Sequence, residues 1–235
     1  MPARYEVFEE ALDELEMTIL LNGPMTLYDA RKALLEKAKT ARRTGPEKQP
    51  NRYAMATVDR HLKMLKEEGE ITVYRTQKHK SGQIKKFYGL TPLGFLMSFT
   101  IPGQVAKNNF TNVMKIWLRE RRFRFFLPND EVLSAIDNRE VETHLASLCQ
   151  MVADIFPEAE DLAEYLMTLG FGQLSLSDII AFTASLSAAR YGEQFVETSR
   201  VLARHLPSYR TAIRQYISAQ RSNLDRLESQ VLGGS

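Results

Sequence analysis

The feature that most constrains the fold is a helical pattern that gives way to a strand pattern at Gly69. The apolar residues before it recur at the spacing of one helical face: Met55, Val58, Leu62 and Leu65. The stretch that follows, "EITVYRTQKHKSGQIKKFYGL", is rich in β-branched and aromatic residues and is divided by "KSGQ". These patterns predict a helix over 52–68, with that apolar face buried, and directly after it a β-hairpin with a basic tip.

Two further helices are predicted ahead of this pair, and one after it. The first ends at Gly23-Pro24 and has these apolar residues at helical spacing: Val7, Ala11, Leu12, Leu15, Ile19 and Leu20. The second begins after Thr26, a suitable N-cap, and a basic loop, "TARRTGPEKQPNR", separates it from the third. After the hairpin, Thr91 can cap a helix that has Pro92 at its first position.

The order of these elements, three helices, a hairpin and a helix, is that of a helix-turn-helix unit with a wing. Pro102-Gly103 marks the predicted domain boundary, and the helical patterns beyond it cover 104–125, 129–153, 158–169, 175–191, 193–205 and 208–231. The predicted fold class is therefore mainly α. It comprises an N-terminal winged helix-turn-helix domain over 1–101, with three helices plus a β-hairpin wing, followed by an all-α helical domain over 102–235.

The stretch "TVDRHLKMLKEEGEI", the hairpin and the exit "KKFYGLTPLGFLMSF" together resemble the winged-helix DNA-binding domain of prokaryotic transcription regulators. The resemblance covers about residues 8–100 and is equally close to the PadR-type and MarR-type families. The long basic loop before the third helix departs from the short connection that many members have. The resemblance implies a regulator that binds double-stranded DNA. For the C-terminal half we recognise no family.

Positive charge is concentrated in one segment, although the net charge of the chain is only +2. Residues 31–86 contain sixteen Lys and Arg against six Asp and Glu, whereas residues 1–30 and 87–235 are both net acidic. A basic segment of this kind attracts a polyanion through counterion release. The alternative is a solvated basic face that has no partner.

The predicted third helix divides into a buried face and an outer face. At 100° per residue, Arg60 and Lys63 lie opposite Val58, and Thr57 lies at the margin of the outer face. The acids at 67–68 come only at the C-terminal end. This layout suits a helix whose N-terminal half enters the major groove while its C-terminal end points away from phosphates.

Several side chains in and around this helix are suited to nucleic acid. Arg52 or Arg60 can pair with guanine, and Asn51 can pair with adenine. Lysines at the hairpin tip and arginines of the basic loop can contact phosphate, although lysines also commonly protect strand edges. The predicted DNA-binding residues are Arg42, Arg43, Asn51, Arg52, Tyr53, Thr57, Arg60, Lys63, Lys78, Lys80, Lys85 and Lys86.

The sequence offers no sign of catalysis. It contains no GxxxxGK[ST], GxSxG or HExxH motif, and its four histidines are far apart, so we expect neither an enzyme nor a bound cofactor or metal ion. The single cysteine, Cys149, excludes an internal disulfide, is expected to be buried, and fits a reducing cytoplasm. No signal peptide and no membrane-spanning stretch of about 18 apolar residues are predicted.

Three stretches of the C-terminal half each allow two interpretations. "KIWLRERRFRFF" is either an extra DNA contact or, as we favour, a junction helix with Trp117, Phe123 and Phe126 in the core. "FGQLSLSDIIAFTASLSAARYG" either lines a ligand pocket or packs tightly, and we favour packing. The last helix either closes the bundle or pairs two subunits, which we favour, along this a/d seam: Ile213, Ile217, Gln220, Leu224, Leu227 and Val231.

The predicted function is that of a cytoplasmic DNA-binding transcriptional regulator. Its third helix would lie in the major groove, and its basic wing would lie on the backbone or in the minor groove. The C-terminal helices would form a homodimer or sense an unidentified effector. The alternative is a winged-helix protein-interaction module within a larger assembly, without sequence-specific DNA binding.

Overall fold

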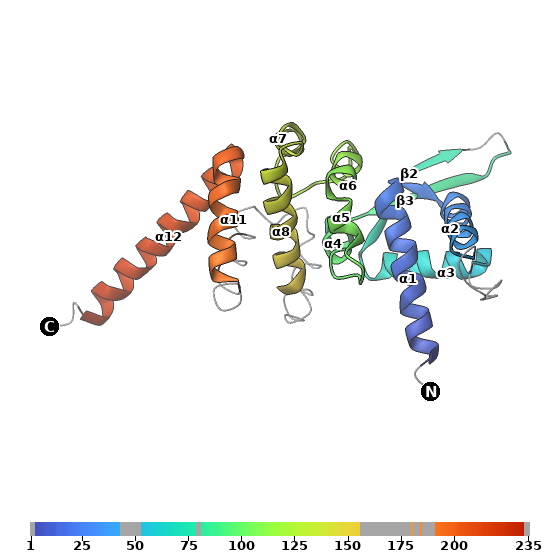
Figure 1. The fold of residues 1–235 in the computed structure, drawn as a ribbon, viewed down its shortest axis with the longest axis horizontal. Coiled ribbons are helices and arrows are strands. Elements are labelled where there is room, and N and C mark those ends of the chain that lie inside the picture. Colours follow the sequence, from blue (N-terminus) through green and yellow to red (C-terminus); the bar gives the residue numbers. More distant parts are fainter. Residues whose placement is uncertain are drawn as a thin grey trace. The chain divides into compact units, whose positions relative to one another are not determined.

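The computed structural model describes residues 3–42, 53–78, 81–155, 180, 184 and 191–232. This part of the chain is mainly helical and contains one small three-stranded antiparallel sheet, in agreement with the predicted class (Figure 1). The chain divides into two compact units, Met1–Phe123 and Arg124–Ser235. This division falls later than the predicted boundary at 101/102, because the segment after Pro102 packs back onto the first helix.

The first unit is built around a hairpin and the helices that flank it in the sequence. In chain order its described elements are α1 (Ala3–Asn22), β1 (Met25–Thr26), α2 (Leu27–Arg42), α3 (Met55–Glu67), β2 (Ile71–Lys78), β3 (Ile84–Leu90), α4 (Pro92–Met97), α5 (Val105–Asn108) and α6 (Phe110–Trp117). Strand β3 lies between β1 and β2 and pairs antiparallel with both. The two-residue strand β1 was not predicted, since it is too short to show an alternating pattern.

The predicted elements before residue 101 occur in the expected order, although α3 begins at Met55 and not at residue 52, whereas the elements just after residue 101 differ. The hairpin follows α3 directly, and Thr91 caps α4 with Pro92 at the first position, as predicted. The single helix expected over 104–125 is wrong: two short helices meet at Asn109, and the second ends at Trp117. The chain then turns so that the Phe123 ring packs against Phe95.

Helix α1 is the centre of the first unit (Figure 1). Every residue from Leu15 to Leu20 is buried, because α2 and α3, strand β3 and helices α5 and α6 all contact this helix. The fully buried Trp117 donates its indole N–H to the Leu20 carbonyl at 2.8 Å. That carbonyl lies in the last turn of α1, and the residue four positions later is Pro24, which has no N–H. Trp117 therefore supplies the hydrogen bond that the helix cannot.

The base of the hairpin is clamped to the start of α4. The Thr91 hydroxyl donates to the Gly69 carbonyl at 2.7 Å and accepts from the Gly94 amide at 3.1 Å. The Thr91 amide donates to the Glu70 carbonyl at 2.8 Å. A β-carbon on Gly94 would lie 2.2 Å from that same carbonyl oxygen. The "LTPLG" stretch thus joins both ends of the hairpin, and only glycine fits at residue 94.

A β-bulge turns Tyr74 toward the core. The pairing of β2 with β3 slips between Val73 and Arg75, which leaves Tyr74 without a partner across the ladder. Its ring meets Trp117 edge-on at 5.9 Å, and its hydroxyl donates to the Leu90 carbonyl at 2.6 Å. A β-carbon on Gly89 would lie 2.9 Å from the same ring. The bulge therefore ties the hairpin to the tryptophan that covers α1.

Helices are the only regular secondary structure among the described residues of the second unit. Its helices are α7 (Asn129–Ala135), α8 (Arg139–Ile155), α11 (Gly192–His205) and α12 (Pro207–Leu232). Helix α11 packs against α8 and α12. The helix predicted over 129–153 is broken at residues 136–138, and the ends of 193–205 and 208–231 agree with α11 and α12 to within a residue. The helices predicted over 158–169 and 175–191 lie outside the described residues, apart from 180, 184 and 191.

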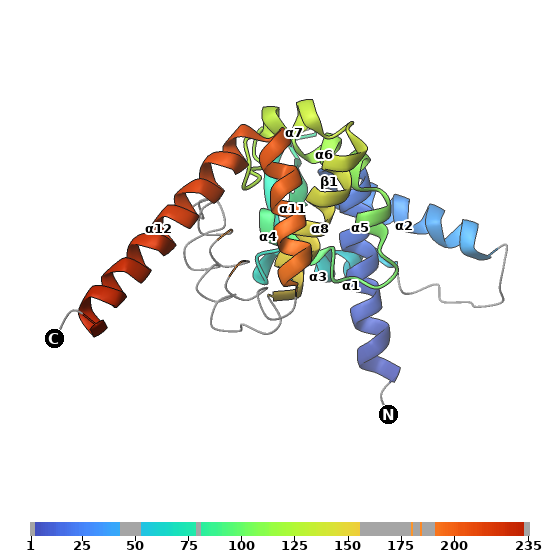
Figure 2. The ribbon, with the colours of Figure 1, turned by 60° about the vertical axis from the view of Figure 1, so that its left-hand side comes forward.

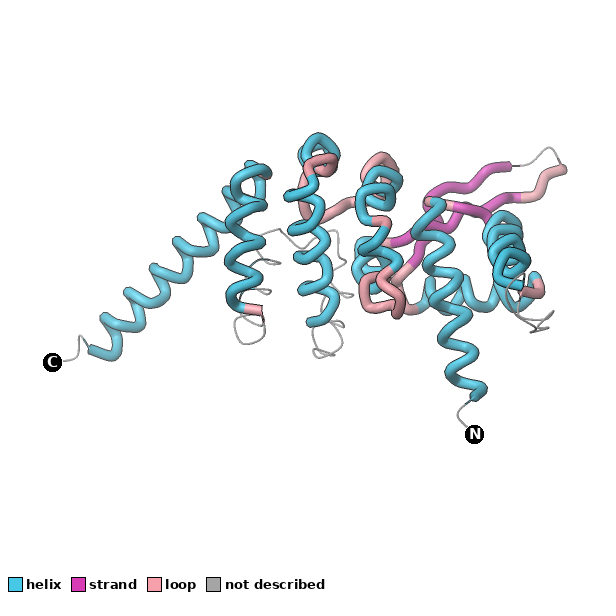
Figure 3. The backbone as a smooth tube through the Cα atoms, in the orientation of Figure 1, coloured by secondary structure: helices cyan, strands magenta, loops and turns pink. Residues whose placement is uncertain are grey.

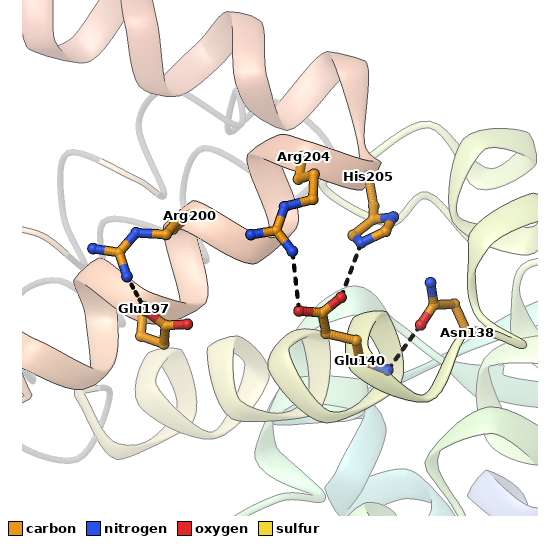
Figure 4. A network of polar contacts seen from close by, with 6 residues as sticks. All are labelled: Asn138, Glu140, Glu197, Arg200, Arg204 and His205. Atoms are coloured by element: carbon orange, nitrogen blue, oxygen red, sulfur yellow. Dashed lines mark hydrogen bonds and ion pairs between the residues drawn. The ribbon is translucent and has the colours of Figure 1, made fainter.

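Polar contacts join α8 to the end of α11 (Figure 4). Glu140, in the first turn of α8, lies 3.3 Å from Arg204 Nη1 and 3.1 Å from His205 Nε2. An acid at a helix N-terminus and bases at a C-terminus both complement the helix dipoles. On α8 the fully buried Cys149 agrees with its predicted place in the core, and burial raises the pKa of its thiol.

We expect Gly94→Ala to lower the free energy of unfolding of the first unit by about 3 kcal/mol, because the added methyl group meets the Glu70 backbone. Trp117 is the only tryptophan of the chain and is fully buried in this unit. Its fluorescence during urea denaturation therefore reports this unit specifically.

Gly82→Ala is the matched control for this substitution. It adds the same methyl group at the hairpin tip, where nothing lies within 4 Å and φ is +83°. The left-handed conformation alone costs about 1 kcal/mol there. A loss for Gly94→Ala no larger than that for Gly82→Ala would contradict the proposed close approach.

Candidate nucleic-acid interface

Helix α3 presents a buried face and an outer face, as its periodicity predicted. Val58, Leu62 and Leu65 are each at most 2% exposed. Met55 is the exception: it was predicted on the buried face but is 40% exposed. It is the first residue of the helix, where α3 has not yet reached the core. The apolar stripe therefore starts one turn later than the sequence indicated.

The outer face of α3 carries charges of both signs. Arg60 and Lys63 are exposed, as predicted. Lys63 Nζ lies 2.7 Å from Asp59 Oδ2, one turn away, and this hydrogen-bonded carboxylate raises the pKa of Lys63. The ammonium group keeps most of its exposure, with 68% of the side chain accessible. Any anionic partner of Lys63 would therefore also approach the Asp59 carboxylate.

Strands β2 and β3 form a hairpin (Figure 3), and their register divides its residues between two faces. Successive side chains of a strand point to opposite faces, and directly paired residues share one. Lys86 pairs with Thr76, and Ile84 pairs with Lys78, so these four share the face of Tyr88. The opposite face holds the pairs Arg75–Phe87 and Gln77–Lys85. The lysines at 85 and 86 are thus neighbours in sequence that lie on opposite faces.

Tyr88 identifies the hairpin face that is turned toward α3. Its phenol interacts electrostatically with Asp59 and Lys63, and its pKa is raised by burial and by the Asp59 charge. An open groove of about 700 Å³ lies here, between α3, the start of α2 and the hairpin. Its lining residues are Thr26, Leu27, Tyr28, Asp29, Met55, Asp59, Ser81, Gln83, Ile84, Lys85, Lys86 and Tyr88.

This groove combines apolar and charged groups. Tyr28, Met55 and Ile84 are large apolar side chains that remain exposed, and all three line it. Asp29, in the first turn of α2, accepts a hydrogen bond from the Thr26 hydroxyl at 2.6 Å. Its carboxylate is therefore occupied by a cap at the start of α2. The face between α3 and the hairpin is amphipathic, with its cations on the hairpin side and at Lys63.

The structure brings together only some of the predicted site residues. Lys78, Lys85 and Lys86 are exposed on the hairpin, and Thr57 is half-buried at the side of α3. Arg43, Asn51, Arg52 and Lys80 lie outside the described residues, as does the side chain of Arg42.

Tyr53 is held against the first two helices. Its hydroxyl donates to Glu14 Oε2 at 2.7 Å, and its carbonyl accepts from Arg31 Nε at 3.0 Å. These bonds link α1 and α2 to the segment that enters α3. The half-buried tyrosine thus positions the N-terminus of α3, a role that its place in the sequence did not indicate.

Two charged residues of α3 and the hairpin were not singled out from the sequence. Arg75 is exposed, and its guanidinium lies 4.3 Å from the centre of the Phe87 ring directly opposite. Asp59 pairs with Lys63, and the i, i+4 spacing of the two residues is the signal that could have identified it. The face assignment of Arg75 depends on the bulge at Tyr74, for which the sequence holds no clear signal.

A pair of carboxyl groups lies just beyond the C-terminus of α3. Glu16 of α1 is almost fully buried, and its carboxyl forms a hydrogen bond with that of Glu70. Burial, and then the negative charge of Glu70, raise the pKa of Glu16 well above 4.5. Burial, and then the charge of Glu68, raise the pKa of Glu70 to about 7. The hydrogen bond between the two carboxyls further raises the pKa of Glu16 and lowers that of Glu70, so Glu16 is the donor of the pair.

Comparisons with known proteins do not add to these observations, since no protein-family model, no curated protein and no solved structure matches the chain. Within the described residues, no three or more His, Cys, Asp or Glu side chains are grouped so that they could hold a metal ion. None of the described helices has both the length and the apolar character needed to cross a membrane.

The carboxyl pair predicts that the first unit loses stability as the pH rises from about 4.5 through about 7. Both groups have a higher pKa in the folded chain than when unfolded, so the folded state binds more protons over this range. We expect Glu16→Gln to flatten the dependence, because the amide N–H₂ keeps the donor to Glu70 and cannot ionise. The measurement is urea denaturation followed by Trp117 fluorescence at several pH values.

Glu36→Gln serves as the control for this pH dependence. Glu36 is exposed on α2, and its hydrogen bond with Lys39 lowers its pKa, so its titration falls below this range. The variant should keep the slope of the unaltered chain between pH 4.5 and 7. An equal slope in Glu16→Gln and in the unaltered chain would show that the pair does not share a proton.

Proposed function

We propose that this chain is a DNA-binding transcription regulator whose first unit is a winged helix. Helix α3 would enter the major groove, and the hairpin would be the wing that follows the adjacent backbone or minor groove. The observation that carries the proposal is the shared orientation of two basic elements. Lys78 and Lys86 share the hairpin face of Tyr88, whose phenol interacts electrostatically with Asp59 and exposed Lys63 of α3.

The charge of this surface supports a polyanionic partner. The segment 31–86 supplies both α3 and the hairpin, and it holds sixteen Lys and Arg against six Asp and Glu. Cations on a protruding ribbon can contact phosphates on either side of a groove, which positions a protein without specifying sequence. Sequence preference would come from α3, where Arg60 is exposed on the outer face.

A protein-interaction module is the second candidate, and the composition of the groove favours it. Tyr28, Met55 and Ile84 expose apolar surface there, and Asp59 lies among them. Exposed apolar patches commonly mark protein interfaces. A protein partner would contact this groove directly, and its affinity would depend on these apolar side chains more than on the lysines of the hairpin.

We also propose that a second copy of the chain is the partner of the C-terminal helices. Winged-helix regulators bind two half-sites as symmetric dimers, and α12 exposes apolar residues along most of its length. A cytoplasmic location follows from this function. The regulator would then combine a DNA-binding first unit with a dimerising second unit.

Lys86→Ala should lower the salt dependence of duplex binding by about one unit of the log–log slope, because one phosphate contact is lost. Arg75→Ala is the matched control, with the same charge change on the opposite face of the hairpin, at a residue that does not line the groove. We expect it to change the slope less. Fluorescence anisotropy with a labelled duplex over a salt series measures both variants. Equal slopes for the two variants would show that the two faces of the hairpin contribute alike, which contradicts the shared orientation of α3 and the hairpin. Absence of binding at low salt would overturn the proposal itself.

Asp59→Asn should tighten duplex binding roughly fivefold, because it removes a carboxylate from the proposed phosphate-facing side and releases Lys63 from its ion pair. Glu67→Gln neutralises an exposed acid at the other end of the same helix, where no phosphate is expected. It should leave the affinity unchanged. Weaker binding by Asp59→Asn, or an equal gain in Glu67→Gln, would indicate that α3 does not present its N-terminal half to DNA.

A further inference from the structure

Helix α12 carries an uncovered apolar stripe over its C-terminal two-thirds. Its first turns pack within the second unit, where Tyr209 is fully buried and donates or accepts a hydrogen bond with Ser199 at 2.9 Å. From Ile217 to Val231, in contrast, every residue is exposed. Figure 2 shows α12 extending away from its junction with α11. Four large apolar side chains in this stretch are 44–74% exposed: Ile217, Leu224, Leu227 and Val231.

The spacing of these residues is that of a coiled-coil seam. Alternating steps of three and four residues place Ile217, Leu224 and Val231 at a positions, and Ile213, Gln220 and Leu227 at d positions. A single helix of this length is marginal in water, and its stability depends on covering its apolar face. A seam of this kind fits the same seam on a second copy, because each a or d residue packs among its counterparts.

The flanking charges distinguish the two orientations that such a pair can take. The e positions hold Arg214, Arg221 and Glu228, and the g positions hold only uncharged residues. In a parallel pair, each e residue faces a g residue of the other helix, so no opposite charges meet. In an antiparallel pair, e faces e, and Arg214 of each copy faces Glu228 of the other. The antiparallel pair therefore gains two ion pairs by symmetry.

The antiparallel alignment also accounts for the remaining polar residues of the seam. Its two-fold axis passes near Ser222, so Leu224 faces Gln220 of the other copy and Leu227 faces Ile217. The two Gln220 side chains approach the axis from opposite sides, where their amides can bond to each other. The two Arg221 side chains also meet at the axis. Asp225 follows Arg221 by four residues on its own helix, which is the spacing for a compensating ion pair.

We propose that two copies of this chain pair through an antiparallel coiled coil of α12, centred near Ser222 and fixed in register by Arg214 and Glu228. This inference rests on the proposed homodimer and adds its orientation and register. The occupant of the exposed stripe is a second α12, selected by charge complementarity between the two ends of the same helix.

Charge exchange tests the orientation. Arg214→Glu and Glu228→Arg each convert two attractive pairs into two repulsive ones, and each should raise the dimer dissociation constant roughly tenfold. The double variant should restore it. Arg226→Glu, an equal charge change at an exposed c position, is the control and should have little effect. Sedimentation equilibrium of the full chain measures all four proteins. Failure of the double variant to recover would overturn the antiparallel register.

Disulfide cross-linking provides a second, independent readout. Leu224→Cys should not cross-link to itself, since the two positions are separated by four residues along the antiparallel pair, whereas a parallel pair would bring them together. Gln220→Cys combined with Leu224→Cys should cross-link. The native Cys149 is fully buried and does not compete. Cross-linking by the single Leu224→Cys variant would contradict the proposal.

The outcomes separate this inference from the proposed function. Duplex binding measured with Lys86→Ala and Arg75→Ala tests the first unit whether or not α12 pairs. A chain that binds DNA but sediments as a monomer would overturn the coiled coil alone. A chain that dimerises through α12 but shows no affinity for duplex DNA at low salt would overturn DNA binding alone.

Discussion

The first unit depends on one hydrogen bond between residues far apart in the sequence, from the Trp117 indole to the Leu20 carbonyl. Pro24 leaves that carbonyl without its ordinary helical partner, and a buried unpaired carbonyl is costly. The bond fixes α6 over the end of α1 and helps to bury every residue of α1 from Leu15 to Leu20. It also explains why the first unit extends to Phe123 and does not end with the hairpin and α4.

Enclosure of α1 has an electrostatic consequence for the candidate interface. Glu16 belongs to the part of α1 that has no solvent-exposed side, so it is held with a raised pKa beside Glu70. Glu70 directly joins α3 to the hairpin, and its carbonyl accepts the amide of Thr91. The junction between the two elements proposed to contact DNA is therefore built on a buried carboxyl of the central helix whose pKa is raised.

Much of the first unit could be predicted from the sequence, because local patterns determine it. The spacing of Val58 and Leu62 predicted the buried face of α3, and Thr91 with Pro92 predicted the start of α4. Contacts between distant residues could not be predicted in this way. The bond between Tyr53 and Glu14 spans 39 positions, and the face of the hairpin on which Arg75 lies depends on a bulge. For the candidate site, the sequence thus supplied the residue types, and tertiary contacts determined which of them share a face.

The hydrogen bonds of Thr91 hold the hairpin at its base, so a rotation at the base displaces the tip most. The start of β2 and the end of β3 are joined by hydrogen bonds at Gly69 and Thr91. From there the eight residues of β2 extend about 26 Å toward the tip, at 3.3 Å per residue. A rotation of about 10° at the base would therefore carry the tip by roughly 4–5 Å. Small adjustments in the packing around Tyr74 and Trp117 would be amplified at the tip, so the aromatic core sets the reach of the hairpin.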